Sequence, residues 1–169
     1  MFSGFSSNSY YHYPIFIIEK LNMSPEEKLF VPKVPLEQIM TKQVICVNVE
    51  DTLDTLDELF NAKHIHHVPV LDMDNQIVGI ISTTDMDQTK WGRSFIMNRD
   101  HKDMDQVLLK TYRTVDIMSS SVITMKKTDT MRDAVAKFNE GKIRIIPIVE
   151  DKRVVGIVSP MDIINHLLK

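Results

Sequence analysis

The sequence predicts a mixed α/β (α+β) fold made of two similar β-α-β-β-α repeats. The first observation behind this prediction is that GIISTTD at residues 79–85 returns as GIVSPMD at residues 156–162. The second is that the segments before the two heptapeptides match each other in order, which indicates an internal duplication. The third is that each copy combines short apolar runs bounded by turn residues with one segment of helical periodicity.

Matched landmarks define the duplication along the chain. Those upstream of the heptapeptides are separated by 78 residues and pair Ile39-Met40-Thr41 with Ile117-Met118-Ser119, Val44-Ile45 with Val122-Ile123, Asp51-Thr52-Leu53 with Asp129-Thr130-Met131, and Val68-Pro69-Val70 with Ile146-Pro147-Ile148. Gly79 and Gly156, in contrast, are separated by 77 residues. The loop before the last strand is therefore one residue shorter in the second copy.

The first copy is expected to begin with a strand at Val44–Val49. A helix from about Thr52 to Lys63 follows, because its apolar residues form one stripe. The members of this stripe are Leu53, Leu56, Leu59 and Phe60. Strands at His67–Leu71 and Ile77–Ser82 are expected to form a hairpin, since the residues between them favour a turn. A second helix is expected after the heptapeptide.

The second copy repeats this order. Its first helix carries apolar residues at helical spacing, namely Met131, Ala134, Val135 and Phe138. Strands are expected at Ile143–Val149 and Val154–Ser159, and a last helix follows Ser159. A repeat of this size has a thin core, so the two copies are expected to pack together as one unit.

Four segments follow from this comparison. Residues 1–35 form an N-terminal arm with an aromatic cluster and several prolines. Residues 36–90 and 114–169 form the two repeat domains. Residues 91–113 are predicted to be a linker that contains a helical segment.

Composition excludes several classes of function. The net charge of -3 gives no basic field that would attract nucleic acid or an anionic membrane, and no apolar run is as long as a membrane span. Cys46 is the only cysteine, so no intramolecular disulfide forms, which suits a cytoplasmic location. The glycines are too far apart for a P-loop or a dinucleotide-binding turn, and neither a catalytic set nor a cofactor is expected.

The heptapeptides allow two interpretations. In the first, Ser82 with Asp85, and Ser159 with Asp162, are capping boxes that start the following helices. In the second, each acid holds the diol of a ribose, because a carboxylate would repel a phosphate at a helix N-terminus. Thr84 would then lie near the sugar.

Basic residues precede the proline strand in both copies. His66 and His67 occupy this place in the first copy and Arg144 in the second, so both could contact phosphates. A histidine cluster at the solvent edge of the sheet, or a pair of histidine rings packed in the core, is an equally good explanation. A metal site is not predicted, because His64 and His66 supply only two ligands on one strand face.

Together these landmarks resemble a tandem pair of CBS domains, also called a Bateman module, of the stand-alone bacterial type. The resemblance covers both copies, about two thirds of the chain. It implies two domains packed through their sheets about a pseudo-twofold axis, and a homodimer shaped like a flat disc. It also implies clefts that in many relatives bind AMP, ADP, ATP or S-adenosylmethionine.

The resemblance implies three groups of ligand-binding residues. Those at the ribose are Ser82, Thr84, Asp85, Ser159 and Asp162. Those that line the adenine pockets are Met40, Gln43, Ile45, Ile65, Met118, Ser121, Ile123 and Ile143. Those at the phosphates are His66, His67 and Arg144. Ile145 and Met161 depart from the pattern by replacing a basic and a hydroxyl residue, so the motif of the first copy is expected to be the better site.

Three functional hypotheses follow. The leading one is a regulatory module that binds an adenine nucleotide or another adenosyl ligand and passes its occupancy to a partner protein through the shape of a dimer. The second is a structural dimerisation or docking module without a small ligand, in which the heptapeptides only cap helices. The third and weakest is an enzyme with Cys46 as nucleophile, because a thiol in a buried strand is more often a small core residue.

Overall fold

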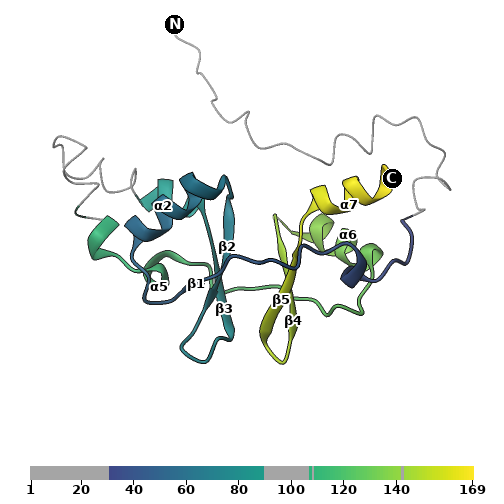
Figure 1. Ribbon diagram of the computed structural model, residues 1–169, viewed down its shortest axis with the longest axis horizontal. Helices are drawn as coiled ribbons and strands as arrows, with labels where there is room; N and C mark the ends of the chain where they lie inside the picture. Colours follow the sequence, from purple (N-terminus) through teal and green to yellow (C-terminus); the bar gives the residue numbers. More distant parts are fainter. Residues whose placement is uncertain (1–30, 90–106, 108, 142) are drawn as a thin grey trace, which may run out of the picture.

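The computed structural model describes residues 31–89, 107, 109–141 and 143–169 (Figure 1). The predicted N-terminal arm, apart from residues 31–35, lies outside the described residues. So does most of the predicted linker, where only residue 107 and residues 109–113 are described.

The first repeat contains a three-stranded sheet. Strand β1 (Val47–Asn48) pairs in parallel with β2 (His67–Leu71), which pairs antiparallel with β3 (Ile77–Ser82). Helix α2 (Leu53–Lys63) connects β1 to β2, and residues 83–89 are helical after β3. The structure confirms the predicted hairpin strands, whereas the first strand is shorter than the predicted Val44–Val49.

The second repeat has the same order with a smaller sheet. Helix α5 (Thr114–Ile117) precedes it, α6 (Met131–Glu140) is its first long helix, and β4 (Ile146–Glu150) pairs antiparallel with β5 (Arg153–Val158). Helix α7 (Pro160–Leu167) follows. The equivalent of β1 is reduced to one parallel bridge between residues 125 and 148, and β4 begins three residues later than predicted.

Helix α6 shows how these helices begin. Thr130 is its N-cap, and the carboxylate of Asp133 accepts hydrogen bonds from the N–H of Thr130 at 3.0 Å and from its hydroxyl at 2.6 Å. This reciprocal arrangement satisfies backbone donors that have no partner inside the helix. Figure 1 shows α2 on one side of the two hairpins and α6 and α7 on the other, with the turns of both hairpins at the bottom of the view.

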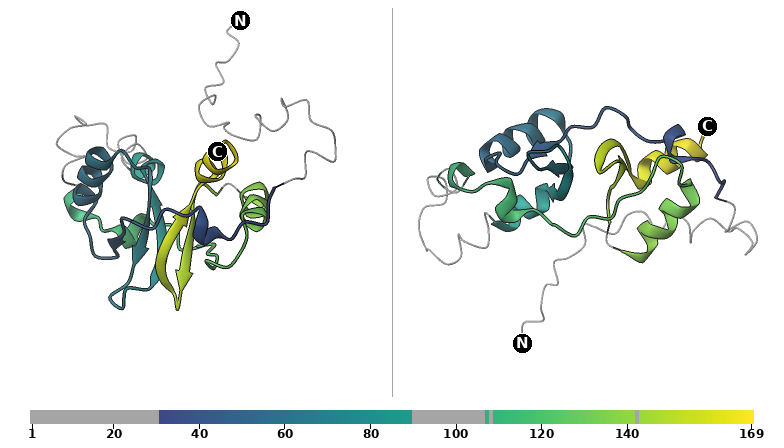
Figure 2. Two further views of the ribbon diagram at one scale, coloured as in Figure 1. Left: turned by 45° about the vertical axis from the view of Figure 1, so that its right-hand side comes forward. Right: turned by 90° about the horizontal axis from the view of Figure 1, so that it is seen from below.

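The two repeats exchange the segments that lead into them. These lead-in segments are residues 36–46 and 114–124, and each packs on the opposite repeat. Thr41 forms two backbone hydrogen bonds with Ile157 of β5, at 2.9 and 3.0 Å, and Ser119 forms the equivalent pair with Ile80 of β3. Figure 2 shows the lead-in segments crossing between the repeats on opposite sides of the two hairpins.

This exchange also connects the two hydrophobic cores. Leu36, which begins the 3-10 helix η2 (Leu36–Gln38), is fully buried in the core of the second repeat with Met131, Ile146 and Ile148. Ile117 packs in turn against the core of the first repeat. Each thin core is therefore completed by side chains from the opposite lead-in segment, as the size of the repeats predicts.

The glycines of the heptapeptides have a packing role in this exchange. A Cβ atom at Gly79 would lie within 3.0 Å of the Sδ of Met118, and one at Gly156 would lie equally close to the Sδ of Met40. A glycine at these two places therefore lets the methionine of the opposite lead-in segment lie directly on the strand backbone.

Within the described residues, no helix is long and apolar enough to cross a membrane.

The exchanged core predicts the effect of substituting Leu36. Leu36→Ala should lower the free energy of unfolding by about 2 to 5 kcal/mol, because it leaves a cavity in the core of the second repeat. Glu37→Ala, at the exposed neighbouring position, is the matched control and should change it by less than about 0.5 kcal/mol. Urea denaturation measures the free energy of unfolding of both variants. Equal losses in the two variants would contradict the packing of Leu36 in the core of the second repeat.

Candidate functional site

Asp85 closes a capping box at the end of β3. Its Oδ2 atom accepts hydrogen bonds from the N–H of Ser82 at 2.8 Å and from the hydroxyl of Ser82 at 2.6 Å. The hydroxyl oxygen of Ser82 accepts in return from the N–H of Asp85 at 3.3 Å. Within the described residues, Oδ1 of Asp85 has no hydrogen-bond partner. One carboxylate oxygen therefore caps the helix, and the other can accept a hydrogen bond from a ligand.

Asp162 repeats this geometry at the start of α7. Its Oδ2 atom accepts from the N–H and the hydroxyl of Ser159 at 2.7 and 2.6 Å. Its Oδ1 atom, however, lies 3.5 Å from the hydroxyl of Thr41 in the opposite lead-in segment. The capping-box interpretation is thus confirmed for both heptapeptides, and the second carboxylate has an additional contact from the opposite lead-in segment.

A cluster of ionisable side chains lies beside Asp85. Burial lowers the pKa of His67, the positive charges of His66 and Arg144 lower it further, and the carboxylate of Asp85 opposes them by raising it. Arg144 belongs to the second repeat and the other three residues to the first. The structure therefore brings together four predicted site residues from both copies.

The lead-in segments place four other predicted residues at the surface. Gln43, Ile45, Ser121 and Ile123 are exposed, with 37% of Ile45 and 41% of Ile123 accessible to solvent. Ser121 and Ile123 follow Ser119, which pairs with β3, the strand that leads to Ser82 and Asp85.

The remaining predicted adenine-pocket residues take part in packing. Ile65 and Met118 are partly buried against the core of the first repeat, and Met40 and Ile143 against that of the second. The sequence comparison did not predict that the two methionines lie on the heptapeptide glycines of the opposite repeat. Thr84 is exposed one position before Asp85.

Cys46 is in a poor environment for a nucleophile. It is half-buried, and burial raises the pKa of its thiol. A reactive cysteine needs the opposite shift, because the thiolate is the nucleophilic form.

No group of three or more potential metal-ligating His, Cys, Asp or Glu side chains occurs in the part of the chain that the structure describes.

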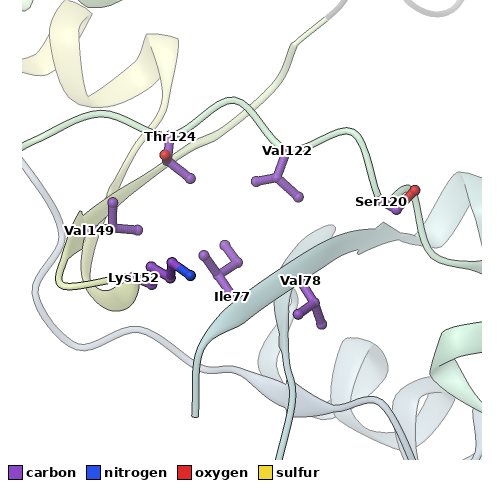
Figure 3. A pocket seen from close by; sticks show the side chains of 7 residues that line it. All are labelled: Ile77, Val78, Ser120, Val122, Thr124, Val149 and Lys152. Carbon is purple, nitrogen blue, oxygen red and sulfur yellow. The ribbon is translucent and has the colours of Figure 1, made fainter. Parts of the chain in front are cut away.

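A cavity of about 400 Å³ lies between the repeats, close to the hairpin turn of the second repeat (Figure 3). None of the predicted site residues lines it. It involves residues from β3, from the second lead-in segment and from the β4–β5 hairpin, so its position depends on how the repeats pack.

The buried His67 predicts a pH dependence of stability. Its pKa in the folded protein lies below the unfolded value of about 6.5, so the unfolded state binds the proton more readily. The free energy of unfolding should therefore decrease as the pH falls below about 6.5. His67→Gln should reduce this slope, as measured by urea denaturation between about pH 7.5 and pH 5.5. Equal slopes in the variant and the unmodified protein would contradict the assignment of this pH dependence to His67.

Comparison with known proteins identifies the family. The family model named CBS domain matches residues 36–88 and 115–169. A CBS domain-containing protein of Dictyostelium discoideum is 25% identical over 138 residues, which are 81% of this chain and 93% of that protein. An inosine-5'-monophosphate dehydrogenase of Methanocaldococcus jannaschii is 25% identical over 148 residues, which are 86% of this chain and 26% of the enzyme.

A solved structure has the same fold. The crystal structure of CBSX2 in complex with AMP superposes with a TM-score of 0.65 at 22% identity, covering 80% of this chain and 96% of that one. Since the two matched segments make up more than half of the sequence, the chain belongs to the CBS-domain family and is a pair of CBS domains, a regulatory module.

Proposed function

We propose that this CBS-domain pair senses an adenine nucleotide or another adenosyl ligand, bound beside Asp85. The observation that carries the proposal is that Oδ1 of Asp85 has no hydrogen-bond partner within the described residues, while the charges of Asp85, His66 and Arg144 all act on His67. A carboxylate oxygen accepts hydrogen bonds from the two hydroxyls of a ribose, and the guanidinium group of Arg144 and the imidazole N–H groups of the histidines can donate to its phosphates. The AMP complex of CBSX2 supports the same ligand class.

The surrounding residues fit the other parts of such a ligand. The exposed hydroxyl of Thr84 lies next to Asp85 in the chain and could contact the sugar. Ile123 exposes apolar surface on the lead-in segment that pairs with β3, which suits the face of an adenine ring. The guanidinium group of Arg144 has the planar donor geometry that suits a phosphate.

The site at Asp162 is the weaker of the two. Thr41 already lies 3.5 Å from its second carboxylate oxygen. Ile145, which stands where His67 lies in the first copy, is buried and apolar. Met161, in the place of Thr84, has no hydroxyl and is 59% exposed. Three differences therefore favour occupancy beside Asp85.

Occupancy of the Asp85 site would change the contact between the repeats. Arg144 comes from the second repeat and Asp85 from the first, so a ligand that contacts both favours one relative position of the two. We infer that this change reaches a partner protein through the shape of a homodimer, in the cytoplasm.

A docking or dimerisation module without a small ligand is the second candidate function. Helix α7 favours it, because the C-terminal end of the chain exposes apolar side chains. These are Met161 at 59%, Leu167 at 50% and Leu168 at 81%.

Calorimetric titration with AMP, ADP, ATP and S-adenosylmethionine tests the proposal. At least one of these ligands should bind. Asp85→Ala should weaken it by about 1.5 to 3 kcal/mol, the loss of hydrogen bonds to a charged group. If none of the four binds to the unmodified protein, the docking function becomes the better explanation.

Asp133→Ala is the matched control for this substitution. Asp133 closes the same type of capping box with Thr130, and it is exposed. Both variants should lose about 0.5 to 2 kcal/mol of folding free energy with the cap. Only Asp85→Ala should lose affinity for the ligand. Equal ligand affinities of the two variants would show that Asp85 acts only as a helix cap.

A further inference from the structure

The cavity between the repeats shares no lining residue with the site proposed beside Asp85. Ser120, Val122 and Thr124 of the second lead-in segment line it, whereas Ser121 and Ile123 are exposed and do not. The two sites therefore use different residues of the same segment.

The lining of the cavity is amphipathic. Its apolar side chains are aliphatic and come from both repeats: Ile77, Val78, Val122 and Val149. Its polar groups are the hydroxyls of Ser120 and Thr124 and the ammonium group of Lys152. Figure 3 shows the side chain of Lys152 directed into the cavity at the end where Thr124 and Val149 lie, with Ser120 at the other end.

A two-residue hairpin turn between β4 and β5 places Lys152 there. Asp151 and Lys152 have φ angles of 49° and 64°, a region that residues with a Cβ atom seldom occupy and that glycine occupies easily. In the longer loop of the first repeat, only Asn75 has a positive φ. The carbonyl of Lys152 accepts a hydrogen bond from the N–H of Ile77 at 3.0 Å, which ties the turn to the first repeat. A strained non-glycine residue held in this way is a candidate for a functional role.

The charge of Lys152 is not neutralised by a salt bridge within the described part of the chain. The neighbouring Glu150 pairs instead with Lys127, at 3.0 Å. The one acidic residue beside it in the chain is Asp151, which is exposed in the same turn. A single cation above an aliphatic cavity favours a ligand that has one negative charge and a hydrocarbon part.

We propose that this cavity binds a small aliphatic carboxylate. The ammonium group of Lys152 and the hydroxyl of Thr124 hold the carboxylate, and Ile77, Val78 and Val122 receive the hydrocarbon. The volume of about 400 Å³ lies in the range of small-molecule sites. Because the cavity includes residues of both repeats, its ligand stabilises the contact between them.

An NMR titration of the full chain with hexanoate tests this proposal, with hexanol and hexylammonium as probes of the same length. Hexanoate should cause saturable changes in the amide shifts of residues 120–124 and 149–153. Hexanol should bind less tightly and hexylammonium should cause no saturable change. The proposal is overturned if hexanoate gives no saturation, or if hexanol binds as tightly as hexanoate.

Two variants test whether the charge of Lys152 contributes to hexanoate binding. Lys152→Gln should weaken hexanoate binding roughly three- to fivefold, the size that an exposed ion pair supports. Arg153→Gln removes the adjacent exposed cation, which does not line the cavity, and should leave the affinity unchanged. Equal effects of both substitutions would overturn the role of Lys152.

Two further variants test the strained turn and the independence of the site. Lys152→Gly should weaken hexanoate binding while the melting temperature stays equal or rises, since glycine relieves the positive φ. A lower melting temperature with unchanged hexanoate binding would contradict both the strain at Lys152 and its role in binding. Asp85→Ala should not affect hexanoate binding, and loss of binding in that variant would show that the cavity is not a separate site.

Discussion

The structure depends on the mutual packing of each lead-in segment on the opposite repeat. Thr41 pairs with Ile157 and Ser119 with Ile80, while Met40 and Met118 lie on Gly156 and Gly79. Neither sheet has enough strands to bury its core alone, because one has three strands and the other two. The exchange supplies the missing apolar cover, and it requires both copies to fold together.

This exchange also determines what the heptapeptides can do. The strand that ends in Ser82 is held beside the lead-in segment of the other repeat, so the carboxylate of Asp85 lies at a junction of the two copies. One oxygen of that carboxylate caps a helix, and the charge of the carboxylate acts on His67 together with the charges of His66 and Arg144. Capping and ligand binding are therefore compatible roles for one side chain, since a carboxylate has two oxygens with several acceptor sites.

The two copies have diverged while keeping this architecture. The first has ionisable groups around its acid, whereas the second has Ile145 and a contact from Thr41. The second instead has a shorter hairpin loop, in which Asp151 and Lys152 have positive φ angles and Lys152 lines the cavity between the repeats. A duplicated module with two different ligand sites would respond to two signals, because each ligand would act on the same contact between the repeats. Such a response fits a regulatory role and requires no catalytic group.

The sequence by itself determined the duplication, the positions of β2, β3 and α2, and the capping boxes of both heptapeptides. These features depend on residues close in the chain, through alternation, helical periodicity and local hydrogen bonds. Only the tertiary structure decided that the predicted strand at Val44–Val49 shortens to Val47–Asn48, that Met40 and Met118 lie on glycines, and that Arg144 approaches His67. Those outcomes, like the cavity, depend on contacts between segments about 20 to 120 residues apart, which no local pattern specifies.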